Sequence, residues 1–124
     1  MAADWRSYCS ASDLTIEGDS VLVHLPGDRA HRVSIHDEQD VYRLTSIIVR
    51  PAVIAQMEAF PLHVWERNRG TELVGFKIDT RRRLIGEAWI PKAGLTAPEF
   101  TTFLHAVAAE CDRFEYQLTG SDSS

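Results

Sequence analysis

Five histidines are the first side chains in this sequence that could do chemistry: His24, His31, His36, His63 and His105. A zinc site needs three or four ligands that converge at about 2.0–2.3 Å from the ion. No HExxH or HxH motif occurs, and strand alternation sends His31 away from the face shared by His24 and His36. We therefore predict solvent-exposed histidines, no metal site and no cofactor.

Ser46, Cys9 and Cys111 are the candidate nucleophiles, and each would need a positioned base. Ser46 lies within a predicted strand, and Cys111 lies on the apolar face of a predicted helix, where a free thiol behaves as a small hydrophobe. No sequence neighbour of Cys9 would lower its pKa. The GxSxG, GxGxxG and GxxxxGK[ST] motifs are absent, as is CxxC spacing. The sequence thus favours a protein that is not an enzyme and has no catalytic residue.

Two tryptophans and a valine could instead recognise a partner protein. Trp89 alternates along its strand with residues of core type, which are Leu84, Ala88 and Ile90. If those residues face the core, Trp89 lies on the outer face, where a large aromatic suits a partner surface. The alternative is a core tryptophan in a sheet covered on both sides, and Trp65 carries the same ambiguity. We predict a partner-binding surface formed by Val64, Trp65 and Trp89.

The arginines Arg81, Arg82 and Arg83 stand at a predicted hairpin turn and could bind an anion. They support an alternative function, a regulator that senses a small ligand or a nucleic acid. However, the chain has 13 Lys and Arg residues and 18 Asp and Glu residues, which gives a net charge of −5. Nucleic-acid binders usually carry the opposite excess. Arginines at an exposed turn more often serve solubility and edge protection, so we predict no nucleic-acid partner.

The fold that positions these side chains is built from 124 residues, which is the length of one domain. We therefore predict a single domain over residues 1–124. The composition, 44% hydrophobic and 25% charged, is typical of a globular protein. Residues 13–49 alternate with a period of two between turn residues, which predicts a β-meander. A hairpin follows over residues 73–90. The order predicts an α+β fold with a mainly antiparallel sheet, packed by a central broken helix and a C-terminal helix.

Two details of the sheet follow from the pattern. A three-residue loop, Gly27-Asp28-Arg29, would pair Val23 with Val33 and keep the apolar residues of both strands on one face. Residues 42–49 form a nearly continuous β-branched run, which predicts a central strand buried on both faces.

The helices have clear boundary signals. Pro51 opens a helical stretch that Pro61 interrupts, so we predict a second short helix over residues 62–68. Thr96 and Glu99 form a capping box ahead of a long apolar periodicity, the strongest helix signal in the chain. We expect a short N-terminal segment over residues 1–12 and a flexible tail over residues 120–124.

Targeting signals are not evident. The first residues, MAADWRSYCS, lack an apolar segment of signal-peptide length, and no run approaches ~18 apolar residues. We expect a cytoplasmic protein with reduced cysteines and no membrane partner.

Much of the chain resembles a known family. The matching segments are RNR at 67–69, GFKID at 75–79, LIGEAWIP at 84–91, GLT at 94–96, EF at 99–100, VAAECDRFE at 107–115 and LTGSD at 118–122; Trp5 and the VHLPGDRAHRVSI hairpin fit more loosely. The pattern resembles the YbjN-type bacterial domain, a type of sensory transduction regulator that shares the fold of type III secretion class I chaperones.

This resemblance implies a non-enzymatic, chaperone-like or adaptor domain that binds a protein or peptide client, commonly as a homodimer. The secretion chaperones hold extended client segments against apolar surface. Two departures stand out. Only residues 2–10 are available for an N-terminal helix, and Pro61 interrupts the central helix that often forms the dimer interface.

Overall fold

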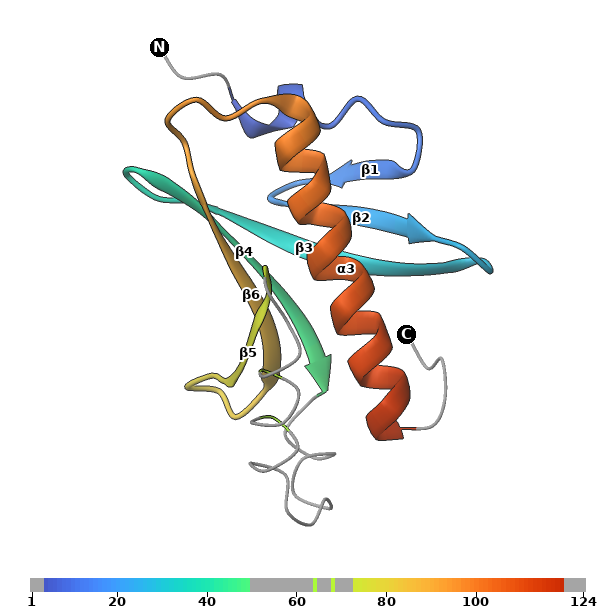
Figure 1. Ribbon diagram of the computed structural model, residues 1–124. Coiled ribbons are helices and arrows are strands. Elements are labelled where there is room, and N and C mark those ends of the chain that lie inside the picture. The colour runs from blue at the N-terminus through green and yellow to red at the C-terminus, as the bar shows by residue number, and fades with distance from the viewer. Residues whose placement is uncertain (1–3, 50–63, 65–67, 69–72, 120–124) are drawn as a thin grey trace.

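The computed structural model describes residues 4–49, 64, 68 and 73–119. A 3-10 helix, η1 (Trp5–Tyr8), precedes four strands: β1 (Leu14–Glu17), β2 (Ser20–Leu25), β3 (Arg29–Asp37) and β4 (Val41–Val49). The hairpin strands β5 (Gly75–Ile78) and β6 (Leu84–Pro91) and the helix α3 (Ala97–Thr119) follow. All strand pairs are antiparallel, in the order β1-β2-β3-β4-β6-β5. The predicted α+β class, with a meander and a later hairpin, is confirmed (Figure 1).

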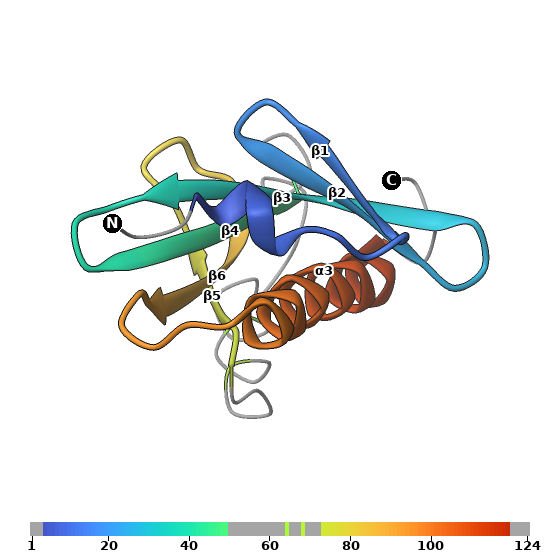
Figure 2. The ribbon, with the colours of Figure 1, turned by 90° about the horizontal axis from the view of Figure 1, so that it is seen from above.

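The core lies between α3 and one face of the sheet (Figure 2). The helix contributes the buried side chains of Phe100, Leu104, Val107 and Cys111. Phe100 is the centre of an aromatic cluster, because its ring lies 5.7 Å from that of Tyr42 and 6.4 Å from that of Trp5. Trp5 thereby ties η1 to the first turn of α3, and its burial is part of what fixes the N-terminal segment.

The start of α3 is set by the predicted capping box. The Thr96 N–H donates to Glu99 Oε1 at 3.2 Å, and the Glu99 N–H donates to Thr96 Oγ1 at 3.4 Å. These two bonds satisfy donors that a helix N-terminus leaves without intrahelical partners. The prediction of this helix boundary is confirmed.

The β2–β3 register differs from the predicted one. Val23 pairs with His31 and Val21 pairs with Val33, so the loop is Pro26-Gly27-Asp28 and the strands are offset by two residues. Gly27 and Asp28 both have positive φ, 82° and 60°, which places the tight turn at these two residues. A shift of two keeps every side chain on its predicted face, and the apolar pattern therefore does not distinguish the two pairings.

The prediction that residues 42–49 are buried on both faces is wrong. Tyr42 and Leu44 are buried under α3, but Ile47 on the opposite face is 39% exposed. Arg43 and Thr45 share that face and are partly exposed. The strand is central in the sheet, yet among the described residues only one of its faces is covered by a helix (Figure 2).

The two helices predicted between residues 51 and 68 lie outside the described residues, except that Val64 and Asn68 have helical backbone conformation. The Asn68 side chain occupies the free edge of β5. Its amide nitrogen donates to the Phe76 carbonyl at 3.0 Å, and its oxygen accepts from the Phe76 N–H at 2.7 Å. Asn68 thus satisfies edge groups that would otherwise be open to another strand. The predicted tail, 120–124, also lies outside the described residues.

In the part of the chain that the structure describes, no helix combines the length and the apolar character needed to cross a membrane.

Candidate partner-binding face

The two faces of the sheet differ in what covers them. We call the face opposite α3 the outer face; over β3, β4, β5 and β6 it carries the side chains of Ser34, His36, Arg43, Thr45, Ile47, Lys77, Ile85, Glu87 and Trp89. Among the described residues no helix lies on it (Figure 2). An uncovered face with apolar side chains is a common feature of surfaces that bind another molecule.

Trp89 is on the outer face, as its alternation with core residues predicts, and it is 51% exposed. Two neighbours fix the ring. The indole N–H donates to Glu87 Oε1 at 3.0 Å, and the Arg43 guanidinium lies 5.7 Å from the ring centroid. The alternative, a core tryptophan, does not apply to this chain. Trp89 is therefore a large, oriented aromatic surface that meets solvent.

Glu87 organises the charges beside Trp89. Its carboxylate pairs with Lys77 Nζ at 3.1 Å and with Arg43 at 3.5 Å. Burial alone would raise the pKa of Glu87, but the hydrogen bonds from Lys77 and Trp89 and the charges of Lys77 and Arg43 lower it overall. Glu87 is thus held ionised, and Glu38, which pairs with Arg43 at 3.0 Å, supplies the second negative charge beside these two cations.

A hollow of about 620 Å³ indents the outer face. Its apolar residues are Ile47, Ile78 and Ile85, of which Ile47 is 39% and Ile78 is 42% exposed. Ile47 and Ile85 pair directly across β4 and β6. Polar groups from Ser34, His36, Thr45 and Thr80 also line the hollow, as do the charged side chains of Arg43, Lys77, Asp79, Arg81 and Arg83. A site with apolar contacts and hydrogen-bonding groups suits a peptide segment better than a bare ion.

Asp79 lies within the predicted anion site and binds part of it. Arg83 donates from Nε to Asp79 Oδ2 at 2.8 Å, and the backbone N–H groups of Arg81 and Arg83 donate to Asp79 Oδ1 at 2.9 Å. Burial would raise the pKa of Asp79, but these bonds lower it. The exposed side chains of Arg81 and Arg82 lie at the turn. The Asp79 carboxylate thus pairs with Arg83 and reduces the positive charge that the turn can offer to an anion.

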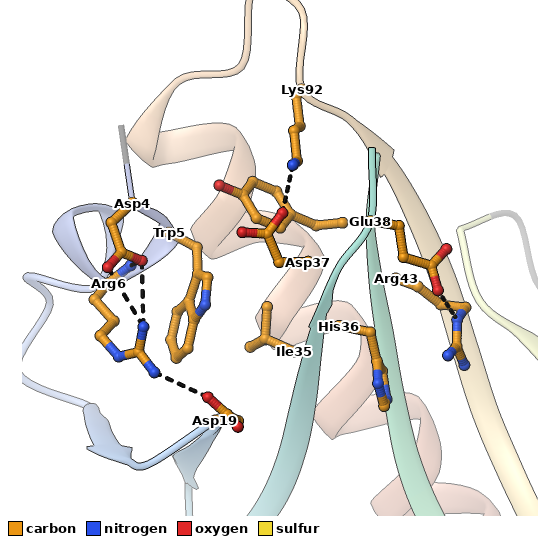
Figure 3. A pocket seen from close by; sticks show the side chains of 11 residues that line it. Asp4, Trp5, Arg6, Asp19, Ile35, His36, Asp37, Glu38, Arg43 and Lys92 are labelled. Carbon is orange, nitrogen blue, oxygen red and sulfur yellow. Dashed lines mark hydrogen bonds and ion pairs between the residues drawn. The ribbon is translucent and has the colours of Figure 1, made fainter. Parts of the chain in front are cut away.

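A second hollow, of about 690 Å³, lies between η1 and the β3–β4 turn (Figure 3). Its charged side chains form ion pairs, which are Arg6–Asp19, Arg43–Glu38 and Lys92–Asp37. His36 and Arg43 line both hollows and pair across β3 and β4. The two hollows therefore have these two lining residues in common.

Val64 and Trp65 were predicted to share a surface with Trp89. Val64 belongs to the hydrophobic core and is 9% exposed, so in this chain it offers almost no surface to a partner. Valine is among the residue types most often buried, and Val64 follows that rule. Trp65 lies outside the described residues.

The candidate nucleophiles are not activated. Burial raises the pKa of Cys9 to about 11 and raises that of Cys111 further. Both thiols are free. The Ser46 hydroxyl donates to the Arg32 carbonyl at 2.6 Å. These groups fill structural roles, and the outer face is the site that the geometry singles out.

The prediction of exposed histidines is wrong for His31, which is 5% exposed beneath α3. Strand alternation does place it on the face opposite His24 and His36, as expected. The error lies in treating its polar side chain as a surface group, although its neighbours on that face, Val33 and Ile35, are buried.

Several residues that line or border the hollow were not singled out in the sequence. Ile47, Ile78 and Lys77 line the hollow, and Glu87 organises its edge. A signal for Ile47 was available, since Arg43 and Thr45 are polar at alternate positions of the same strand and mark a solvent-facing side.

No protein-family model and no curated protein matches this chain. Several solved structures share its fold, among them chains of two complexes. A chain of the HopA1–SchA chaperone–effector complex is 10% identical, with a TM-score of 0.53 over 98% of this chain and 89% of that one. A chain of the ExsC–ExsE complex is 15% identical, with a TM-score of 0.50 over 94% and 90%. The fold is that of the type III secretion chaperones, while the YbjN resemblance stays a prediction.

Proposed function

We propose that this chain is a non-enzymatic, chaperone-like protein that binds an extended segment of a partner protein across the outer face. The half-exposed Trp89, beside a hollow where three isoleucines lie among polar and charged side chains, carries the proposal. Tryptophan is enriched among the residues that dominate binding energy at interfaces. The similar solved structures are complexes of two proteins, which supports a protein partner.

An extended occupant is favoured by the shape of the face. The hollow on the outer face is lined by residues of β3, β4, β5 and β6, and the second hollow shares His36 and Arg43 with it. The cations Arg43, Lys77 and Arg83 are already paired with carboxylates. We therefore propose that burial of apolar side chains on Trp89 supplies most of the affinity, and that binding weakens little with salt. An anion-binding regulator would instead show a steep salt dependence.

A second copy of this chain is the competing occupant, since the family resemblance implies a homodimer. The homodimer remains a proposal, and it need not use the outer face. Sedimentation equilibrium of the wild type and of Trp89→Ala separates the two cases. A dimer that survives the substitution leaves the outer face to a client, whereas conversion to monomer assigns that face to self-association.

A peptide library displayed on phage tests the proposal. The wild-type chain is expected to select peptides with apolar side chains at alternate positions. Hydrogen exchange then locates a selected peptide, which should slow amide exchange in β4, β5 and β6 rather than in α3. Failure to select any peptide, or protection confined to α3, would contradict the proposal.

A further inference from the structure

His31 carries a buried nitrogen with an unused lone pair. Its Nε2 atom lies 3.2 Å from the Ile47 carbonyl oxygen. A carbonyl oxygen only accepts, so Nε2 must carry the proton and donate, which leaves Nδ1 unprotonated. Nδ1 is buried and has no hydrogen-bond partner. The residue is 5% exposed, so solvent does not supply one freely.

Helix α3 brings two carboxylates to the same place. Asp112 and Glu115 are three residues apart and lie on one side of the helix. Each offers one oxygen that lies within 4.8 Å of the other and of an imidazole nitrogen of His31. Asp112 is 2% exposed, and its Oδ1 atom has no hydrogen-bond partner.

Buried acceptors without donors are costly and uncommon in folded proteins. Here Nδ1 of His31 and Oδ1 of Asp112 both lack a partner. A cation coordinated by these atoms would satisfy both acceptors at once.

We propose that His31, Asp112 and Glu115 bind a divalent transition-metal ion, most suitably Zn²⁺. One imidazole nitrogen and two carboxylate oxygens are a donor set that zinc accepts, with water completing four-coordination. Ligands at zinc distances stand about 3.4 Å apart, so the side chains must close by rotation on binding. Glu115, the only partly exposed member, is the one that can move most easily.

Arg29 supports this arrangement. Its guanidinium pairs with Asp112 Oδ2 at 3.0 Å and so fixes the carboxylate while Oδ1 stays available. Arg29 and Asp112 also line a cavity of about 250 Å³ between the β2–β3 turn and α3. The bound ion would join β3 to the C-terminal half of α3, a structural role rather than a catalytic one.

The test uses untagged full-length chain, stripped of metal, and measures Zn²⁺ binding by calorimetry and Co²⁺ binding by visible absorption. The wild type is expected to bind Zn²⁺ at a saturable site and to give the intense spectrum of four-coordinate Co²⁺. Glu115→Gln should weaken Zn²⁺ binding by more than about tenfold, while His24→Gln, a change at an exposed histidine, should not alter it.

A second variant, His31→Asn, removes the nitrogen ligand, and circular dichroism checks that it folds. Glu115→Gln decides the question alone if His31→Asn does not fold. The proposal is overturned if the wild type binds no Zn²⁺ saturably, if Glu115→Gln binds as tightly as wild type, or if His24→Gln weakens binding equally.

Discussion

The sulfur of Cys111 in α3 stands over Gly86 of β6, well inside van der Waals distance of the point where a Cβ on Gly86 would lie. A Cβ there would also lie 3.4 Å from Cε1 of Phe76. Cys111 is fully buried, so the sulfur has no open side to move to. The missing side chain of Gly86 therefore sets how closely α3 approaches the sheet.

Gly86→Ala should therefore destabilise the fold by about 1–3 kcal/mol, since the added methyl overpacks the core. Cys111→Ala in the same chain removes the clashing sulfur and should recover part of the loss. Urea unfolding of Gly86→Ala, of Cys111→Ala, of the double variant and of the wild type measures both effects. Equal stability of Gly86→Ala and wild type would show that the helix–sheet contact is looser than described.

Both cysteines should be slow to react in the native state. The pKa of Cys9 is about 11, so at pH 8 only about one Cys9 in a thousand is a thiolate. Cys111 is still less reactive, because burial raises its pKa further. Thiol labelling with Ellman's reagent should be more than about tenfold slower in buffer than in denaturant. Rapid labelling without denaturant would contradict the burial of these residues.

Asp79 should stabilise the β5–β6 turn in a pH-dependent way. Its pKa in the folded state lies below the ordinary 3.8, so the stabilisation is complete above that value and is lost as the pH falls through the folded pKa. Asp79→Asn should cost about 1–2 kcal/mol near pH 7. The difference from wild type should stay constant down to about pH 5 and shrink below about pH 4, as unfolding curves across pH can show.

The capping box at Thr96 should contribute to the stability of α3. Thr96→Ala removes the side-chain oxygen that accepts from the Glu99 N–H, and a lost cap of this kind costs about 1 kcal/mol. Thr102→Ala is a matched control, because its hydroxyl donates to the Pro98 carbonyl inside the helix and caps no free donor. Thermal unfolding should separate the two, and an equal loss would assign no special role to the cap.

The sequence was most informative where a local pattern decides the structure. Thr96 and Glu99 predict the start of α3, because the hydrogen bonds of a capping box form within a single turn of the chain. Alternation along the strand put Trp89 opposite the residues of core type, but only its exposure of 51% decides between an outer face and a second covered face. The burial of Val64 was missed, since one short helix carries too few residues to define an apolar face.

Predictions failed where distant segments meet. The β2–β3 register is offset by two residues, and both registers put the same side chains under α3, so only turn geometry at Gly27 and Asp28 decides. The approach of His31 to Asp112 depends on how α3 crosses β3, which neither segment encodes alone. The sequence of either segment therefore does not indicate that His31 and Asp112 lie close together.

The most direct test of the account compares two aromatic residues of equal exposure. Trp89 is 51% and Tyr116 is 50% exposed, but Tyr116 lies on α3 and Trp89 on the outer face. Fluorescence anisotropy of a labelled, library-selected peptide measures affinity for each alanine variant. Trp89→Ala should weaken binding about 30-fold, an effect of about 2 kcal/mol, while Tyr116→Ala should leave it unchanged. Unchanged affinity in Trp89→Ala, or an equal loss in Tyr116→Ala, would contradict a partner site on the outer face.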